Sequence, residues 1–305
     1  MTVAQSLERI RKLALRRETI YVAYVIDDQR HLLGTVSLKD LVIAPPEAKL
    51  GDIMTVNPKW VSTHTDQEEV AQVLRDYDIL AVPVVDAEER LVGIVTWDDV
   101  VDIMEQETTE DIYRLGALQG GEQGNYFTTS ILNVMRRRVV WLLLLVLVNT
   151  VTGSIIGWHN DLLQQFVILT IFIPLVMGTG GNVGAQSSTV VIRGLATGEI
   201  KSSEAAKIVA REVSVGLAMG VIIGVLAFSW AFAWRHQIEV AVSVGLALLG
   251  ISAMATFVGV TLPFLFRLFK VDPALVSAPL ITTVMDIFGI TFYLVIATIM
   301  LRGIL

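Results

Sequence analysis

The chain has 305 residues, of which 53% are hydrophobic and 17% are charged, a composition too apolar for two ordinary soluble domains. Its net charge of −7 excludes a nucleic-acid-binding protein, because such proteins need a basic field. The absence of cysteine excludes disulfides, thiol nucleophiles and cysteine-based zinc sites. Before Val139 lie 23 of the 30 acidic residues, so we predict a charged domain followed by a membrane domain.

The first part of the chain contains a repeat with a constant offset of 59 residues. Val25-Ile26-Asp27 matches Val84-Val85-Asp86, and each match is followed by a glycine and then by Ser/Thr-x-x-Asp. Each copy predicts a strand, an acidic turn, a second strand and a helix. An amphipathic helix over residues 3–15 precedes the first copy; its Arg and Lys residues distinguish it from a signal peptide, so we expect a cytosolic domain. The second copy adds a strand at 59–62 and a helix at 66–77.

These two copies resemble a tandem pair of CBS domains, whose signature occurs at residues 34–40 and 93–99. The resemblance implies an adenine nucleotide such as ATP as a regulatory ligand, with the hydroxyl on a phosphate and the aspartate on a ribose. The same residues also form a helix N-cap, so both interpretations stay open. The candidate nucleotide-binding residues are Ser37, Asp40, Thr96 and Asp99.

An acidic band lies between residues 60 and 111, where fifteen acids face only Arg75 and Arg90. On the helix predicted from about residue 98, the acids recur at three- and four-residue spacing, so they repel one another. Divalent cations such as Mg²⁺ prefer carboxylate ligands and would relieve this repulsion. The alternative interpretation is a solvated acidic face that aids solubility.

Five apolar stretches are long enough to cross a bilayer. The second ends in four glycines between residues 178 and 184, so we expect it to be broken there. Nine basic residues outside the spans fall on the side of the N-terminal domain and two on the other side, which predicts an inner-membrane protein with a cytosolic N-terminus and an external C-terminus. The predicted spans cover about 139–158, 162–178, 207–233, 239–266 and 279–301.

Asp286 lies inside the fifth predicted span, where a carboxylate costs about 2.5–3.5 kcal/mol on insertion scales. Ala278, Thr282 and Asp286 are spaced by four and share one helix face. One carboxylate is too little to dehydrate Mg²⁺, so we predict a homodimer in which two copies of Asp286 meet at a pore for a hydrated cation. Asn182 or Gln186 would provide further contacts. The four histidines are scattered, which argues against an enzyme.

Nearly the whole chain resembles the MgtE family of magnesium channels and transporters, on residues 174–188, 193–199 and 271–286. The resemblance implies a homodimeric Mg²⁺-selective pore that closes when cytosolic Mg²⁺ binds the acidic CBS surfaces and the connecting helix. It implies a pore site at Asp286, lined by Gly181, Asn182, Ala185, Gln186, Ala278 and Thr282. The implied regulatory ligands are Asp66, Glu68, Asp78, Asp99, Asp102, Glu107, Glu110 and Asp111.

The expected fold is therefore a cytosolic α/β tandem CBS domain, a long connecting helix and an α-helical membrane domain with five transmembrane helices. Compared with the family, we expect the chain to lack the N-terminal helical domain and the start of the first CBS repeat. A carrier coupled to Na⁺ or H⁺, with Asp286 as the relay, is the main alternative, and a receptor that transports nothing is a third. The expected boundaries are 1–55 for the incomplete first repeat, 56–105 for the second, 98–125 for the connecting helix and linker, and 126–305 for the membrane domain.

Overall fold

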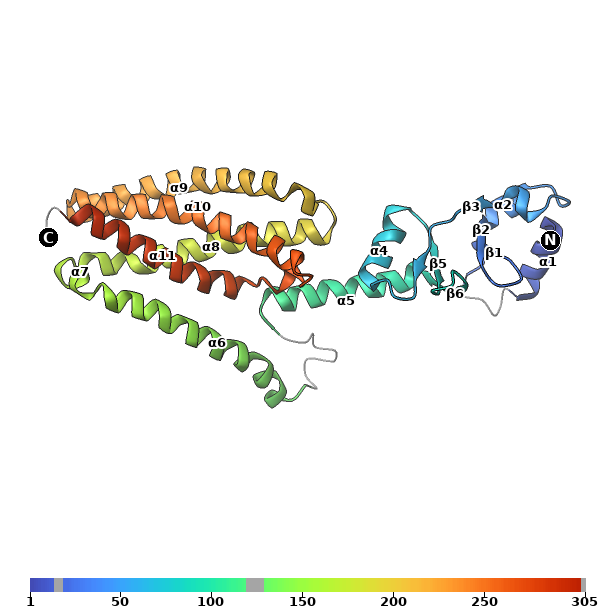
Figure 1. Cartoon of the computed structure of the whole chain (residues 1–305), viewed down its shortest axis with the longest axis horizontal. Helices are drawn as coiled ribbons and strands as arrows, with labels where there is room; N and C mark the ends of the chain where they lie inside the picture. The colour runs from blue at the N-terminus through green and yellow to red at the C-terminus, as the bar shows by residue number, and fades with distance from the viewer. Residues whose placement is uncertain (14–18, 119–128, 303–305) are drawn as a thin grey trace. The chain divides into compact units, whose positions relative to one another are not determined.

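The computed structural model describes residues 1–13, 19–118 and 129–302. The chain divides into two compact units, Met1–Thr109 and Glu110–Leu305, and Figure 1 labels their helices and strands. The break that we expected at residues 120–121 lies outside the described residues. The order of elements is an α/β region followed by a helical region, which confirms the expected fold class.

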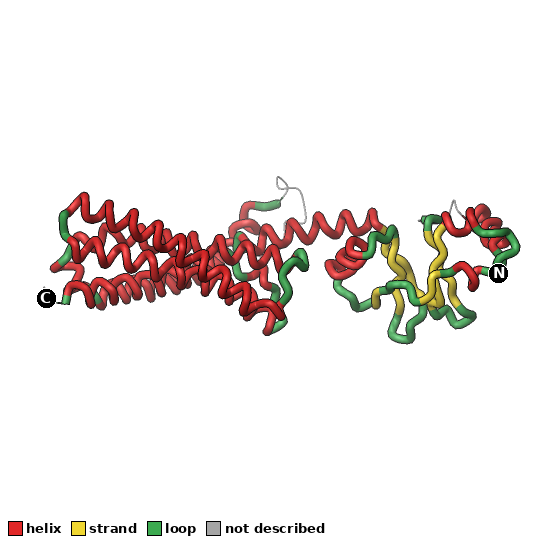
Figure 2. The backbone as a smooth tube through the Cα atoms, turned by 90° about the horizontal axis from the view of Figure 1, so that it is seen from above, coloured by secondary structure: helices red, strands yellow, loops and turns green. Residues whose placement is uncertain are grey.

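The first unit contains two three-stranded sheets, with the orders β1-β2-β3 and β4-β5-β6. Figure 2 shows their strands in yellow, with short helices beside them. Two small apolar cores hold the unit, one around Val3, Val36 and Leu41 and the other around Leu74 and Val82. The elements are α1 (Val3–Leu13), β1 (Val22–Ile26), β2 (Leu32–Ser37), α2 (Leu38–Ile43), α3 (Leu50–Ile53), β3 (Thr55–Val56), β4 (Val61–Ser62), α4 (Gln67–Asp76), β5 (Ala81–Val85), β6 (Leu91–Thr96) and α5 (Trp97–Leu115).

The repeat at an offset of 59 residues is confirmed by the strand register. Val25 pairs with Gly34 in the first hairpin, and Val84 pairs with Gly93 in the second. Each hairpin has a register shift directly after this pair. The two hairpins therefore share their pairing and their irregularity as well as their sequence pattern.

The acidic turn of each hairpin is held by its aspartate. Asp27 accepts a hydrogen bond from the His31 backbone N–H at 2.8 Å, and Asp86 accepts one from the Arg90 N–H at 2.9 Å. The pKa of Asp27 is lowered mainly by the side-chain hydrogen bond from His31, and that of Asp86 mainly by the Arg90 backbone. Because both pKa values are lowered on folding, the two carboxylates stabilise the turns above about pH 4, and this stabilisation is lost as the pH falls through the lowered values.

The second unit is helical, and five of its described helices are long and apolar enough to cross a membrane. The first of them begins at Ile131 rather than at residue 139, so it includes Arg136, Arg137 and Arg138. The buried Tyr293 hydroxyl of α11 donates to the Leu169 carbonyl of α8 at 3.0 Å and ties two of the helices together. The elements are α6 (Ile131–Trp158), α7 (Asn160–Gln165), α8 (Ile168–Ala196), a 3₁₀ turn (Ser202–Glu204), α9 (Ala205–Arg235), α10 (Ile238–Leu268), a second 3₁₀ turn (Pro273–Leu275) and α11 (Ala278–Leu301).

The expected break in the second span is wrong, because α8 continues as a helix from Ile168 to Ala196 through all four glycines. The glycines are used for close packing instead. A Cβ atom at Gly181 would lie 2.9 Å from Thr282 of α11, and one at Gly184 would lie 2.8 Å from Ile281. Contacts with neighbouring helices therefore stabilise a sequence that would be a weak helix in isolation.

Helices α9 and α10 also approach each other at glycines. Gly220 and Gly224 of α9 face the backbone of α10, where added Cβ atoms would lie 2.8 Å from the Leu249 oxygen and 2.7 Å from the Gly245 oxygen. A Cβ at Gly259 of α10 would clash with a backbone carbonyl of α8. Small residues at these positions set the distances between helices, as is common in membranes.

We expect Gly259→Ala to lower the free energy of unfolding by about 1–3 kcal/mol, because the new methyl group overpacks a backbone contact. Gly178→Ala is the matched control, since a Cβ there meets no other atom within 4 Å. The control should be neutral or stabilising by up to about 1 kcal/mol, because alanine is the better helix former. Thermal unfolding of the full chain in detergent measures both, and equal effects would contradict the proposed packing role.

Candidate functional site

Helix α11 places a polar strip in the membrane unit. Its N-cap Ser277 accepts a hydrogen bond from the Leu280 N–H at 3.4 Å, so the helix begins with Ala278. Ala278, Thr282 and Asp286 follow at four-residue spacing on one face. Asp286 is half-buried, and among the described residues it has no hydrogen bond and no ion pair. A carboxylate without a partner inside a spanning helix is costly, so this position is a candidate functional site.

Helix α8 continues the polar strip beside α11. Gly181 is buried against Thr282, which brings the two helices into contact at this level. Asn182 and Gln186, one turn apart on α8, are both exposed, and Ala185 between them is half-buried. A single copy of the chain therefore leaves amide groups uncovered next to the face that carries Asp286.

The chemistry of this strip suits a hard cation that keeps much of its water. The Thr282 hydroxyl donates to the Pro279 carbonyl at 2.9 Å, which leaves its oxygen able to accept from water. Carboxylate, hydroxyl and amide oxygens can bind Mg²⁺ directly or accept hydrogen bonds from the water molecules around it. No group of three acidic or histidine side chains among the described residues is placed to hold a metal ion, so one chain provides Asp286 alone.

Among the regulatory acids that the family resemblance implied, Asp66 caps α4 and Asp99 lies in the first turn of α5. Asp66 accepts from the Glu68 N–H at 3.0 Å, and Asp99 accepts from the Thr96 hydroxyl at 2.8 Å. In the first repeat the Ser37 hydroxyl donates to Asp40 at 2.6 Å in a complete capping box. The helix-cap interpretation is therefore confirmed for the first CBS signature, and in the second Asp99 accepts from the Thr96 backbone N–H as well as from its hydroxyl. The role of both signatures toward a nucleotide stays a prediction.

Most of the remaining predicted acids lie on α5. Glu107 accepts a hydrogen bond from the Gln67 side chain at 2.5 Å, and Asp102 is exposed. Glu110 forms an ion pair with Arg114. Asp78 follows α4 with a φ of 50°. In the described part of the chain, these acids are thus spread over a surface and do not converge on one metal site.

An ion pair that sequence reasoning missed joins α5 to the segment before α11. Arg114, which already pairs with Glu110, also pairs with Asp272. Asp272 in addition accepts from the Ala274 N–H at 2.8 Å and so caps the 3₁₀ turn that leads to α11. No pattern in the sequence relates residues 114 and 272.

The comparisons with known proteins cover both units. The family profile of MgtE, described as a divalent cation transporter, matches residues 173–296, and the CBS domain profile matches residues 50–106. The magnesium transporter MgtE of Thermus thermophilus is 41% identical over 304 residues, which are 100% of this chain and 67% of that protein. MgtE of Enterococcus faecalis is 35% identical over 303 residues, 99% of this chain and 66% of that protein.

A solved structure of the cytosolic domain of the Mg²⁺ channel MgtE in complex with ATP is 50% identical, covers 34% of this chain and 42% of its own, and has a TM-score of 0.33. The chain spans about two thirds of the length of its curated relatives. Those relatives are named as magnesium transporters and not as enzymes. With identity that runs through the CBS region and through the spanning helices, this chain belongs to the MgtE family of magnesium transporters.

Proposed function

We propose that this protein transports Mg²⁺ across the cytoplasmic membrane through a pore shared by two copies of the chain. The observation that carries the proposal is the carboxylate of Asp286, which is half-buried in α11 and has no partner among the described residues. Such a group needs a counter-charge or water inside the bilayer. A hydrated divalent cation supplies both.

A dimer would resolve two problems of a single chain, which are its exposed amide groups on α8 and its lone carboxylate. The exposed Asn182 and Gln186 of α8 would face lipid in a monomer, where uncovered polar groups are unfavourable. A second copy related by a two-fold axis covers this strip and brings a second Asp286 to the same axis. Two carboxylates balance the charge of one Mg²⁺, and the remaining oxygens contact its water shell.

The orientation that we propose places the N-terminal unit in the cytosol. Basic residues gather at the ends of the helices on that side, at Arg136, Arg193, Lys201 and Lys270 among others, while Arg235 and Arg302 lie at the opposite ends. Lys and Arg are enriched in cytosolic loops of membrane proteins. The C-terminus then lies outside.

We also propose that cytosolic Mg²⁺ closes this pore. The acids of the first unit and of α5 repel one another, and bound cations would remove this repulsion. Arg114 gives α5 a direct ionic contact with Asp272, in the segment before α11. A change in α5 on Mg²⁺ binding would therefore act on the helix that carries Asp286. The coupling is reciprocal, because Mg²⁺ shifts the equilibrium only through its preference for the closed form.

A nucleotide is a second regulatory ligand that we propose for the CBS repeats. The hydroxyl and carboxylate pairs Ser37–Asp40 and Thr96–Asp99 stand at the same place in each repeat. Each carboxylate already accepts bonds in a helix cap, so a ribose would use the lone pairs that the cap leaves free.

We expect Asp286→Ala to reduce Mg²⁺ flux at least tenfold, because the variant removes the charge that replaces lost hydration in the membrane. Flux is measured with a Mg²⁺-sensitive dye in proteoliposomes that contain the full chain. Asp161→Asn is the matched control, since Asp161 is exposed near a helix end. Undiminished flux in Asp286→Ala would refute the central site, and flux that requires a Na⁺ or pH gradient would favour the carrier.

We expect the combined variant Glu107→Gln, Glu110→Gln and Asp111→Asn to need at least about fivefold more cytosolic Mg²⁺ for half-closure. The physical reason is that the variant removes carboxylate ligands, so Mg²⁺ binds the closed form less tightly and shifts the equilibrium less. Patch recordings with Mg²⁺ titrated on the cytosolic face measure the shift. A variant with the exposed Glu47 and Asp52 neutralised is the control, and a sensor hypothesis would fail if both variants behaved alike.

The ion pair of Arg114 with Asp272 is tested by a double-mutant cycle. Asp272→Asn removes the charge but keeps a side chain that caps the following turn. We expect this variant and Arg114→Gln each to weaken closure by Mg²⁺ about two- to tenfold, and the double variant to be no worse than either single one. Additive effects in patch recordings would show that the two residues act independently.

A further inference from the structure

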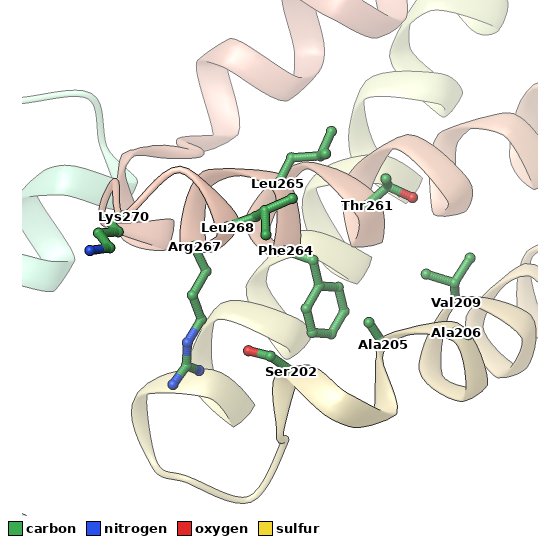
Figure 3. A pocket seen from close by; sticks show the side chains of 10 residues that line it. All are labelled: Ser202, Ala205, Ala206, Val209, Thr261, Phe264, Leu265, Arg267, Leu268 and Lys270. Atoms are coloured by element: carbon green, nitrogen blue, oxygen red, sulfur yellow. The ribbon is translucent and has the colours of Figure 1, made fainter.

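A pocket of about 560 Å³ lies between the N-terminal end of α9 and the C-terminal end of α10. Figure 3 shows its wall, in which the Phe264 ring lies next to Ala205, with Val209 further along α9. These side chains are apolar, and the volume lies in the range of small-ligand sites. The pocket is open on one side, toward the surface of the membrane unit.

Two cations and a hydroxyl stand at the mouth of this pocket. Arg267 and Lys270 are exposed, and neither forms an ion pair or a side-chain hydrogen bond with any described residue. In Figure 3 the Arg267 side chain extends toward Ser202, whereas the Lys270 side chain extends away from both. The ten described residues that line the pocket include Arg267 and Lys270 but no acid, so its mouth is positive and its wall is apolar.

Lys270 occupies a backbone position that normally favours glycine. Its φ is 57°, its N–H donates to the Arg267 carbonyl at 3.0 Å, and the Val271 N–H donates to the Phe266 carbonyl at 2.8 Å. These bonds form a Schellman motif, in which a left-handed residue ends the helix. Lysine is conformationally less favourable than glycine at such a position.

The place of the pocket in the membrane unit fits a lipid better than a soluble anion. The pocket lies at the end of the membrane unit where Arg193, Lys201 and Lys207 gather. Basic pockets between spanning helices on the cytosolic side bind anionic head groups.

We propose that this pocket binds an anionic glycerophospholipid. Its phosphate lies beside Arg267 and Ser202, with Lys270 adding positive charge nearby, and the first part of an acyl chain packs against Val209 and Phe264. The apolar wall favours a lipid over free phosphate, because free phosphate has no apolar group that could pack against it. The site is independent of the proposed pore, because none of its lining residues lies on the strip that carries Asp286.

Native mass spectrometry of the delipidated full chain tests this proposal, with phosphatidylglycerol and phosphatidylcholine of the same acyl chains. We expect the wild type to bind phosphatidylglycerol at least fivefold more tightly. The variant with Arg267→Gln and Lys270→Gly should bind phosphatidylglycerol about 10- to 25-fold more weakly. Its affinity for phosphatidylcholine should change by less than twofold. Glycine suits the left-handed position, so this variant keeps its fold, which circular dichroism verifies.

Lys207→Gln is the matched control, because Lys207 is exposed at the same end of α9 but does not line the pocket. It should change either affinity by less than twofold. An equal loss in the control would show general surface attraction and overturn the proposal. Displacement of the lipid from the wild type by millimolar inorganic phosphate would also overturn it, since the site would then accept a soluble anion. Ala206→Trp, which fills the apolar part, should weaken both lipids.

Discussion

The requirement to solvate one carboxylate inside the membrane governs the second unit. Asp286 sits in α11 without a partner among the described residues, and a charge in that setting is stable only with water, a cation or a second chain. The polar strip of α8 and α11 is left uncovered by the chain's own helices. The exposed amides and the carboxylate therefore both need contact with water, a cation or a second chain. The aqueous pathway that we propose between two copies of the chain would meet this need.

The same helices stay close enough to form this strip because glycines line their contacts. Gly181 lets α8 rest on Thr282, and without a Cβ at this point the two polar faces can lie side by side. Glycine is a poor helix former, yet α8 remains helical from Ile168 to Ala196. Packing contributes more than propensity here, since each close approach adds dispersion contacts along both helices. The glycine run is therefore a packing feature of the site and not a hinge.

The sequence predicted what depends on local or periodic patterns. The offset of 59 residues predicted two hairpins with the same register, and the position of Asp286 within an apolar stretch predicted an isolated carboxylate. It failed where neighbours far away in the chain decide the outcome. The helical state of the glycine run depends on α10 and α11, and the pairing of Arg114 with Asp272 depends on a contact across 158 residues. Neither the helical glycine run nor this ion pair produces a periodic pattern in the sequence, so only the structure could reveal them.

The segment between α10 and α11 joins features that looked separate in the sequence. Within it, Lys270 ends α10 at the mouth of the basic pocket, Asp272 receives Arg114, and Ser277 caps the helix that carries Asp286. A capped 3₁₀ turn lies between Asp272 and Ser277, so the connection between the ion pair and the start of α11 is short and ordered. In the proposed gating, a movement of α5 that acts on Asp272 would therefore be passed to the start of α11, and with it to the carboxylate of Asp286.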